Sequence, residues 1–248
     1  MKKIYDKSET TFAIMWIIIY VVGASICNSI SESIGMPRLV SLVYSVICVI
    51  VLLGFIKKNG LSEIYGLCSF KGDKKTFLYF IPIALISITN LTGGLALNDD
   101  LLKCVIMSAA VAVAGIVEEL IFRGLLFVGM CKDNVKSAII VSSVTFGIGH
   151  IVNLLNGAPL FSTLCQIIYA VAIGFCFTIV FKTGKSLIPC IISHFVVNAL
   201  SVFAVLPEGE SAVRARGIFV TVYITVISVV YSLWLVNKHK DTILDKDF

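Results

Sequence analysis

The amino-acid sequence predicts an all-α, polytopic membrane protein with about eight transmembrane helices. First, 58% of its 248 residues are hydrophobic and only 14% are charged, whereas soluble domains carry about 25% charged residues. Second, apolar runs of about 20 residues, the length that a helix needs to cross a bilayer, recur along the whole chain. Third, most basic residues fall in segments that would lie on one side of the membrane.

Eight apolar runs form the predicted spans, and turn-forming sequences such as IGMP, LNDD, NGAP and PEGE separate them. No internal repeat divides the chain, so we expect residues 1–248 to form a single membrane domain. The first run follows the charged segment MKKIYDKSETTF without a convincing cleavage site, which indicates an uncleaved signal anchor. The longest loop, 57–75, is expected to lie partly along the membrane surface. The expected spans are roughly 12–30, 37–56, 76–97, 101–130, 135–153, 161–181, 186–206 and 216–237.

The positions of the basic residues indicate the orientation of the chain. If the N-terminus is cytoplasmic and the chain crosses the membrane eight times, fifteen of the 20 basic residues lie in cytoplasmic segments. Only Arg38, Lys103, Arg214 and Arg216 lie on the outer side, and Arg123 lies within a span. This bias follows the positive-inside rule, so we expect both termini on the cytoplasmic side of a cell membrane. The lysine-rich, compact chain is typical of a bacterial protein. Its net charge of +5 comes from lysines in the loops between spans, so we expect no nucleic-acid partner.

Ionisable and amide side chains occur at overlapping depths in three of the predicted spans. At 1.5 Å per residue, Glu118 lies about 20 Å and Arg123 about 12 Å above the cytoplasmic end of their span. By the same rise His150 lies at about 22 Å, His194 at about 12 Å and Asn198 at about 18 Å. Because ionisable groups at bilayer depth are costly, their convergence predicts a functional site.

Helical spacing separates the two neighbouring glutamates. Glu119 and Arg123 are four residues apart on one helix face, so they are expected to form an ion pair. Glu118 is rotated by about 100° from Glu119 and is therefore free to face another helix. His194 and Asn198 are also four residues apart and share one face. This chemistry alone is compatible with a hydrolytic or metal site, a transport pathway, or a polar network that only fixes helix packing.

Two smaller features are expected to be structural. Asp99 and Asp100 precede the fourth predicted span and are expected to cap its first turn. Asn90 and Thr92 in the third predicted span are expected to form hydrogen bonds between helices.

Three short motifs lie in order on successive spans: EELIFR at 118–123, FGIGH at 146–150 and HFVVN at 194–198. Together they resemble the CAAX protease and bacteriocin-processing (CPBP, or Abi) family of intramembrane proteases, over roughly residues 100–205. The resemblance implies a catalytic core in this segment and hydrolysis of peptide bonds in membrane-associated peptides or proteins. It leaves a second interpretation open, a non-proteolytic membrane scaffold that acts in bacteriocin immunity or regulates a sensor. The implied catalytic residues are Glu118, Glu119, Arg123, His150, His194 and Asn198.

Amide hydrolysis requires an activated water, a proton donor for the leaving amine, and stabilisation of an oxyanion. We expect Glu118 to take the proton of the water and His150 to orient that water. His194 and Asn198 can donate hydrogen bonds to the oxyanion. Glu119 and Arg123 are expected to brace the helix, although Arg123 could instead hold a substrate carboxylate.

The sequence leaves open whether a metal takes part. Glu118, His150 and His194 have the side chains of a catalytic zinc site with an open fourth position. The same groups suffice for a metal-free mechanism based on the glutamate. Because no helix carries a His-Glu-x-x-His pair, the metal-free mechanism is the favoured expectation.

Overall fold

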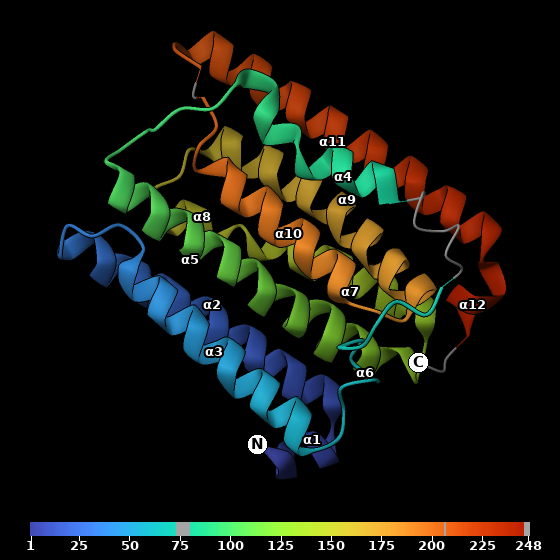
Figure 1. Cartoon of the computed structure of the whole chain (residues 1–248). Helices are drawn as coiled ribbons and strands as arrows, with labels where there is room; N and C mark the ends of the chain where they lie inside the picture. Colours follow the sequence, from blue (N-terminus) through green and yellow to red (C-terminus); the bar gives the residue numbers. More distant parts are fainter. Residues whose placement is uncertain (73–79, 206, 246–248) are drawn as a thin grey trace.

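The computed structural model describes residues 1–72, 80–205 and 207–245, and the described chain is a bundle of helices (Figure 1). The described residues contain no strand, apart from one isolated bridge between Leu95 and Ala204. This confirms the all-α prediction. The helices are α1 (Lys2–Lys7), α2 (Glu9–Ser33), α3 (Leu39–Lys58), α4 (Ile81–Ser87), the 3-10 helix η2 (Thr89–Gly93), α5 (Leu101–Glu119), the π-helix η3 (Leu120–Phe127), α6 (Val128–Cys131), α7 (Val135–Gly149), α8 (Val152–Leu155), α9 (Leu160–Gly184), α10 (Ile188–Ser201), α11 (Glu210–Lys238) and α12 (Lys240–Leu244).

Six helical segments of the described chain are long and apolar enough to cross a membrane, which confirms a multi-pass protein but not the expected count of about eight. These are Glu9–Ser33, Leu39–Lys58, Leu101–Cys131, Val135–Leu155, Leu160–Gly184 and Glu210–Lys238.

The other two predicted spans do not form long helices within the described residues. The span expected at 76–97 begins partly outside the described residues, and its described part is the seven-residue α4 followed by η2. This helical segment ends at Gly94, whose φ of 90° breaks a helix. The span expected at 186–206 is the 14-residue α10, which ends at Ser201. Beyond α10 the chain turns, and the Phe203 carbonyl accepts a hydrogen bond from Ala96 N–H. The segment after α10 therefore pairs with the segment after η2 and does not continue the helix.

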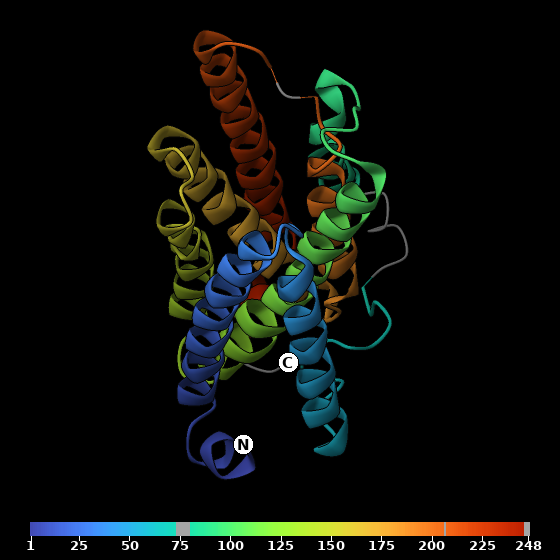
Figure 2. The ribbon, with the colours of Figure 1, turned by 90° about the vertical axis from the view of Figure 1, so that its left-hand side faces the viewer.

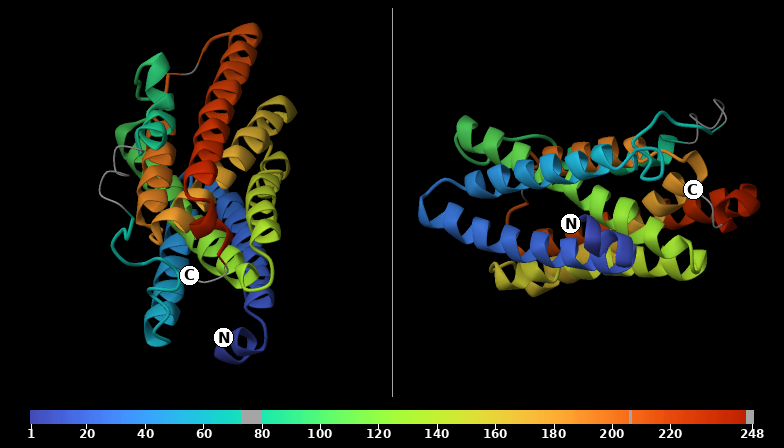
Figure 3. Two further views of the ribbon diagram at one scale, coloured as in Figure 1. Left: turned by 90° about the vertical axis from the view of Figure 1, so that its right-hand side faces the viewer. Right: turned by 90° about the horizontal axis from the view of Figure 1, so that it is seen from below.

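The helices α2 and α3 run in opposite directions, α3 and α5 run in the same direction, and α1 and α12 lie toward the same end of the bundle (Figures 1 and 2). The hairpin of α2 and α3 lies on one side and α11 on the opposite side (Figure 3). Between them α9 packs against α7 and α11, while α5 packs against α3 and α10. Of the span of α9, 61% is buried inside the protein, against 22% for α2, so α9 is the central helix.

The fourth span changes its helical geometry directly after the two glutamates. Residues 120–127 form a π-helix in which every residue is buried. Its altered hydrogen bonding is supported from α7, where the Ser142 hydroxyl donates to the Phe122 carbonyl at 2.8 Å. Arg123 lies within this segment. Isolated π-helical turns are uncommon and often occur at functional sites.

The described part of the loop expected at 57–75 packs onto the end of the bundle that carries α1. Tyr65 is fully buried, and its hydroxyl donates to that of Tyr5 at 3.1 Å. Burial is the main reason that the pKa of Tyr5 is raised. The loop is joined to the turn between α9 and α10 because Leu187 N–H donates to the Gly66 carbonyl at 2.8 Å.

The two smaller structural predictions are borne out at Asp100 and Asn90. The Asp100 carboxylate caps α5 by accepting the backbone N–H of Lys103 at 3.0 Å, and this hydrogen bond lowers the pKa of Asp100. Asn90 donates its side-chain amide to the Val197 carbonyl at 2.8 Å and so joins η2 to α10. Thr92 instead donates within its own helix, to Thr89, so its expected interhelical bond is not formed.

Candidate active site

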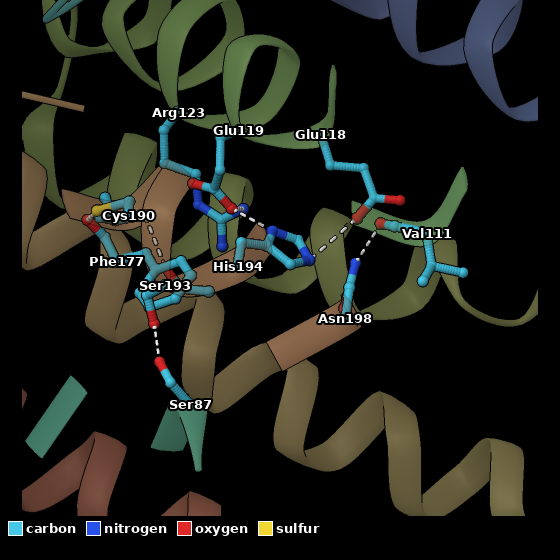
Figure 4. Close-up of polar contacts among 12 residues, drawn as sticks. Ser87, Val111, Glu118, Glu119, Arg123, Phe177, Cys190, Ser193, His194 and Asn198 are labelled. Carbon is cyan, nitrogen blue, oxygen red and sulfur yellow. Dashed lines mark hydrogen bonds and ion pairs between the residues drawn. The ribbon is translucent and has the colours of Figure 1, made fainter. Parts of the chain in front are cut away.

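Glu119 is the centre of a buried polar cluster (Figure 4). Its Oε1 accepts a hydrogen bond from Arg123 Nη1 at 2.9 Å, and both side chains are fully buried. The ion pair expected from the four-residue spacing is therefore confirmed. The same Oε1 lies 2.8 Å from His194 Nδ1, so α10 is joined to α5 at this point.

His194 lies between the two neighbouring glutamates (Figure 4). While Nδ1 is bonded to Glu119, Nε2 faces Glu118 with 3.5 Å to Oε2. This confirms that Glu118 faces another helix. The side chain of Glu118 is 18% exposed, whereas that of Glu119 has no exposed surface. The two glutamates thus occupy different environments although they are adjacent in the chain.

The Arg123 guanidinium is enclosed by aromatic rings. Its Cζ lies 4.1 Å from the centroid of Phe146 and 5.7 Å from that of Phe177. Its Nε and Nη2 have no hydrogen-bond partner among the described residues, so the ring faces supply part of the compensation that a buried cation needs. Gly174 lets α9 approach, since a Cβ there would lie 3.3 Å from Arg123 Nη2. This enclosure indicates a bracing role for Arg123, as expected.

Gly115, which is part of none of the three motifs, allows the close contact between α5 and α10. A Cβ at this position would lie 3.0 Å from His194 Cδ2 and 3.2 Å from Asn198 Nδ2. Directly beside it, Asn198 donates its side-chain amide to the Val111 carbonyl at 2.9 Å. A signal was present, because a glycine one turn before Glu118 and Glu119 is typical of a close helix contact in a membrane.

A cavity of about 610 Å³ lies beside Glu118, and we call it the Glu118 cavity. His150 and Asn198 line it as well, so three of the six expected catalytic residues reach the same space from three helices. Glu119 and Arg123 do not line the cavity, and His194 faces the lining residue Glu118 through Nε2. His150 packs against Phe146 with 5.4 Å between ring centroids, as their shared helix face predicts. Further polar residues of the wall are Tyr20, Ser25, Asn28, Glu32, Arg38, Asn153, Asn156, Gln166 and Ser201.

The cavity opens at the end of the bundle that lies away from α1 and α12. Its exposed lining includes Arg38 in the turn between α2 and α3, and Asn156 and Gly157 in the turn after α8. The lining residues of α2 and of the turn after it were missed because they carry no motif and meet the site only through folding. Asn153 on α8 and Gln166 on α9 are joined at 2.8 Å, which connects the two sides of this opening.

The described residues do not assemble the ligand set of a zinc site. No group of three or more histidine, cysteine, aspartate or glutamate side chains in the described chain is arranged to hold a metal ion. Glu118 and His194 are close, but His150 does not complete a set with them. His194 Nδ1 is also bonded to Glu119, which leaves only Nε2 as a potential ligand atom.

Comparison with protein families gives an independent result. Residues 100–200, from the start of α5 to the end of α10, match the family described as type II CAAX prenyl endopeptidase Rce1-like. The match confirms the resemblance to the CAAX protease family and supports a membrane protease at the general level. The helices α1–α4, α11 and α12 lie outside the matched segment. No curated protein matches the chain.

Proposed function

We propose that the protein is an intramembrane endopeptidase acting on membrane-associated peptides or proteins, because residues 100–200 match the type II CAAX prenyl endopeptidase Rce1-like family. The observation that carries this proposal is that Glu118 and His150, from two different helices, line one cavity inside the bundle. A carboxylate and an imidazole beside enclosed space are the groups that hydrolysis by an activated water requires.

Glu118 is the general base of the proposed mechanism. It takes a proton from a water whose oxygen forms a bond to the peptide carbonyl carbon, while His150 orients that water through a ring nitrogen. When the C–N bond of the tetrahedral intermediate breaks, protonated Glu118 gives its proton to the leaving amine. The products are a new carboxyl group and an amine, and Glu118 is ionised again.

We assign the oxyanion to His194 and Asn198. Asn198 uses one amide hydrogen for the Val111 carbonyl, so its second hydrogen remains for the substrate. His194 Nδ1 donates to Glu119, because an ionised carboxylate can only accept. In the doubly protonated imidazole Nε2 also carries a hydrogen, and its 3.5 Å from Glu118 is long for a hydrogen bond. This N–H can therefore donate a hydrogen bond to the oxyanion.

We propose that His194 acts with both ring nitrogens protonated, because Glu119 accepts from Nδ1 and the oxyanion accepts from Nε2. Glu119 and Arg123 thus position His194 and hold its charge without contacting the substrate.

We also propose the orientation expected from the basic residues, with both termini cytoplasmic. The Glu118 cavity, which opens at the end away from α1 and α12, then faces the outer side of the cell membrane. Substrates would reach it from the bilayer and from that side.

Mass spectrometry of peptides released from membrane substrates tests the proposed activity. The purified protein and its Glu118→Gln and His150→Ala variants are compared in lipid nanodiscs. Loss of an acid–base group should lower the cleavage rate by about 100- to 10,000-fold. Glu210→Gln is the matched control, because this exposed glutamate pairs with Arg214 far from the cavity.

The same comparison in cells separates a protease from a scaffold. If Glu118→Gln retains full biological function, the non-proteolytic alternative is favoured, in which the fold binds and regulates a membrane partner. Loss of function with normal insertion and abundance supports catalysis.

A further inference from the structure

We propose that Arg38 binds a carboxylate group of the substrate at the opening of the Glu118 cavity and thereby selects the peptides that are cleaved. The inference rests on the proposed protease function. It concerns the turn between α2 and α3, which lies outside the segment that matches the family. Among the described residues that line the cavity, Arg38 is the only lysine or arginine.

The Arg38 guanidinium is available for a ligand. It is exposed, and no ion pair joins it to another residue of the described chain. Glu32 lines the same opening but is not within ion-pair distance. Arg38 and Glu118 line the same cavity. An arginine so placed can bind a carboxylate with two parallel hydrogen bonds.

The backbone around Arg38 is held in one conformation. Arg38 has a φ of 59°, a left-handed value that is uncommon for residues other than glycine. The buried Ser31 fixes this turn from α2, because its hydroxyl accepts Val40 N–H at 3.0 Å and donates to the Cys27 carbonyl at 2.7 Å. Unusual backbone conformations that persist in this way cluster at binding sites.

Asn28 on α2 lines the same cavity. Its Oδ1 is buried and accepts no hydrogen bond from the described residues. A buried acceptor without a partner is costly, and a peptide N–H would satisfy it. In the proposed binding mode the peptide carboxylate lies at Arg38 and the carbonyl of the cleaved bond lies beside Glu118, because both side chains line one cavity. The carboxylate can belong to a C-terminus or to an aspartate or glutamate side chain.

The test uses a mixed library of random octapeptides, prepared with free and with amidated C-termini, and nanodiscs of phosphatidylcholine. Cleavage by the wild type, Arg38→Ala and Arg38→Lys is quantified by mass spectrometry. We expect the wild type to prefer peptides with a carboxylate at a fixed distance from the cleaved bond. Arg38→Ala should lower kcat/KM about 10- to 100-fold for these peptides only, mainly through KM, as expected for a charge-assisted contact. Arg38→Lys should retain part of the preference.

The library also identifies the source of the carboxylate. A preference lost on amidation assigns Arg38 to a C-terminus, and one that follows aspartate or glutamate assigns it to a side chain. Arg214→Ala is the matched control, because Arg214 lies in the first turns of α11, is exposed and pairs with Glu210. It should leave the preference unchanged.

Binding measurements separate this inference from the protease function. In the Glu118→Gln background, fluorescence anisotropy of a labelled carboxylate peptide should show weaker binding when Arg38 is replaced by alanine, and no change for its neutral analogue. Such binding without any cleavage by the wild type would keep the Arg38 site and reject the protease. Equal effects of Arg38→Ala on charged and neutral peptides, or no effect on either, overturn the inference. If added phosphatidylglycerol inhibits cleavage and the wild type shows no preference for carboxylate peptides, Arg38 binds lipid phosphate instead. This result would also overturn the inference.

Discussion

Glu119 and Arg123 form an ion pair of 2.9 Å whose two side chains have no exposed surface. The preceding residue, Glu118, lines a cavity and is 18% exposed. Because a helix turns by about 100° per residue, adjacent glutamates can serve a buried structural contact and a reaction site at the same time.

Glutamine should lower stability at position 119 and activity at position 118. Glu119→Gln leaves Arg123 buried without its counter-charge and should lower the free energy of unfolding by about 3–5 kcal/mol. Glu118→Gln should abolish hydrolysis with little effect on stability. Thermal unfolding in detergent and peptide release measure the two properties on the same preparations.

A double-mutant cycle with Arg123→Gln measures the coupling within the pair. The double variant Glu119→Gln, Arg123→Gln should recover part of the stability that either single variant loses, since no unpaired charge remains. Equal losses for Glu118→Gln and Glu119→Gln, or the absence of coupling between positions 119 and 123, would show that the two roles are not divided in this way.

Gly115→Ala should impair activity more than stability. A Cβ at 3.0 Å from His194 Cδ2 forces α10 to move by a few tenths of an ångström, and small misplacements of catalytic groups cost about 10- to 100-fold in rate. The stability loss should be about 1 kcal/mol, as for mild overpacking. Gly54→Ala on α3 is the control, because a Cβ at that position would meet no other part of the described chain within 4 Å. Equal activity of the two variants would contradict the contact.

Hydrolysis should continue after metal is removed. The described residues assemble no set of three ligands, and Glu118 with His150 suffices to activate water. Elemental analysis is performed beside the peptide-release assay, before and after chelation. If activity instead follows zinc content and returns with added zinc, the metal is the Lewis acid and its ligands include His150 or His194.

The two sides of the membrane should differ in their access to labelling reagents. Single cysteines are introduced at Glu63 and Glu208, both exposed, in a background without other cysteines. An impermeant maleimide added to intact cells should label position 208 and not position 63, because the lysine bias places the 57–75 loop in the cytoplasm. Labelling at position 63 under these conditions would reverse the orientation. It would also move the opening of the Glu118 cavity to the cytoplasmic side.

Features that depend on near neighbours in the chain could be predicted from the sequence. Composition and run length indicated a multi-pass helical protein, because a bilayer demands apolar segments of a set length. The pairing of Glu119 with Arg123 and the contact of Phe146 with His150 followed from the four-residue repeat of a helix. The family resemblance also rested on such local motifs, and it indicated which segment would carry the catalytic residues.

Distances between side chains on different helices could not be predicted from helix geometry. The estimated depths of Glu118 and His194, about 20 and 12 Å, assume parallel helices that begin at a common plane, yet their side chains are 3.5 Å apart. Helix tilt and starting level are set by packing between helices, not by the residues of one helix. The shortness of α10 and the π-helix after Glu119 arise in the same way.

The sequence by itself determined that this is a helical membrane protein, which residue types could carry hydrolysis, and which of them share a helix face. Only the tertiary structure decided that His194 lies between the glutamates, that α10 packs closely against Gly115, and that Arg38 lines the Glu118 cavity. The physical reason is that helix geometry is local, with about 3.6 residues in each turn, whereas contacts between helices depend on the fit of side chains far apart in the chain.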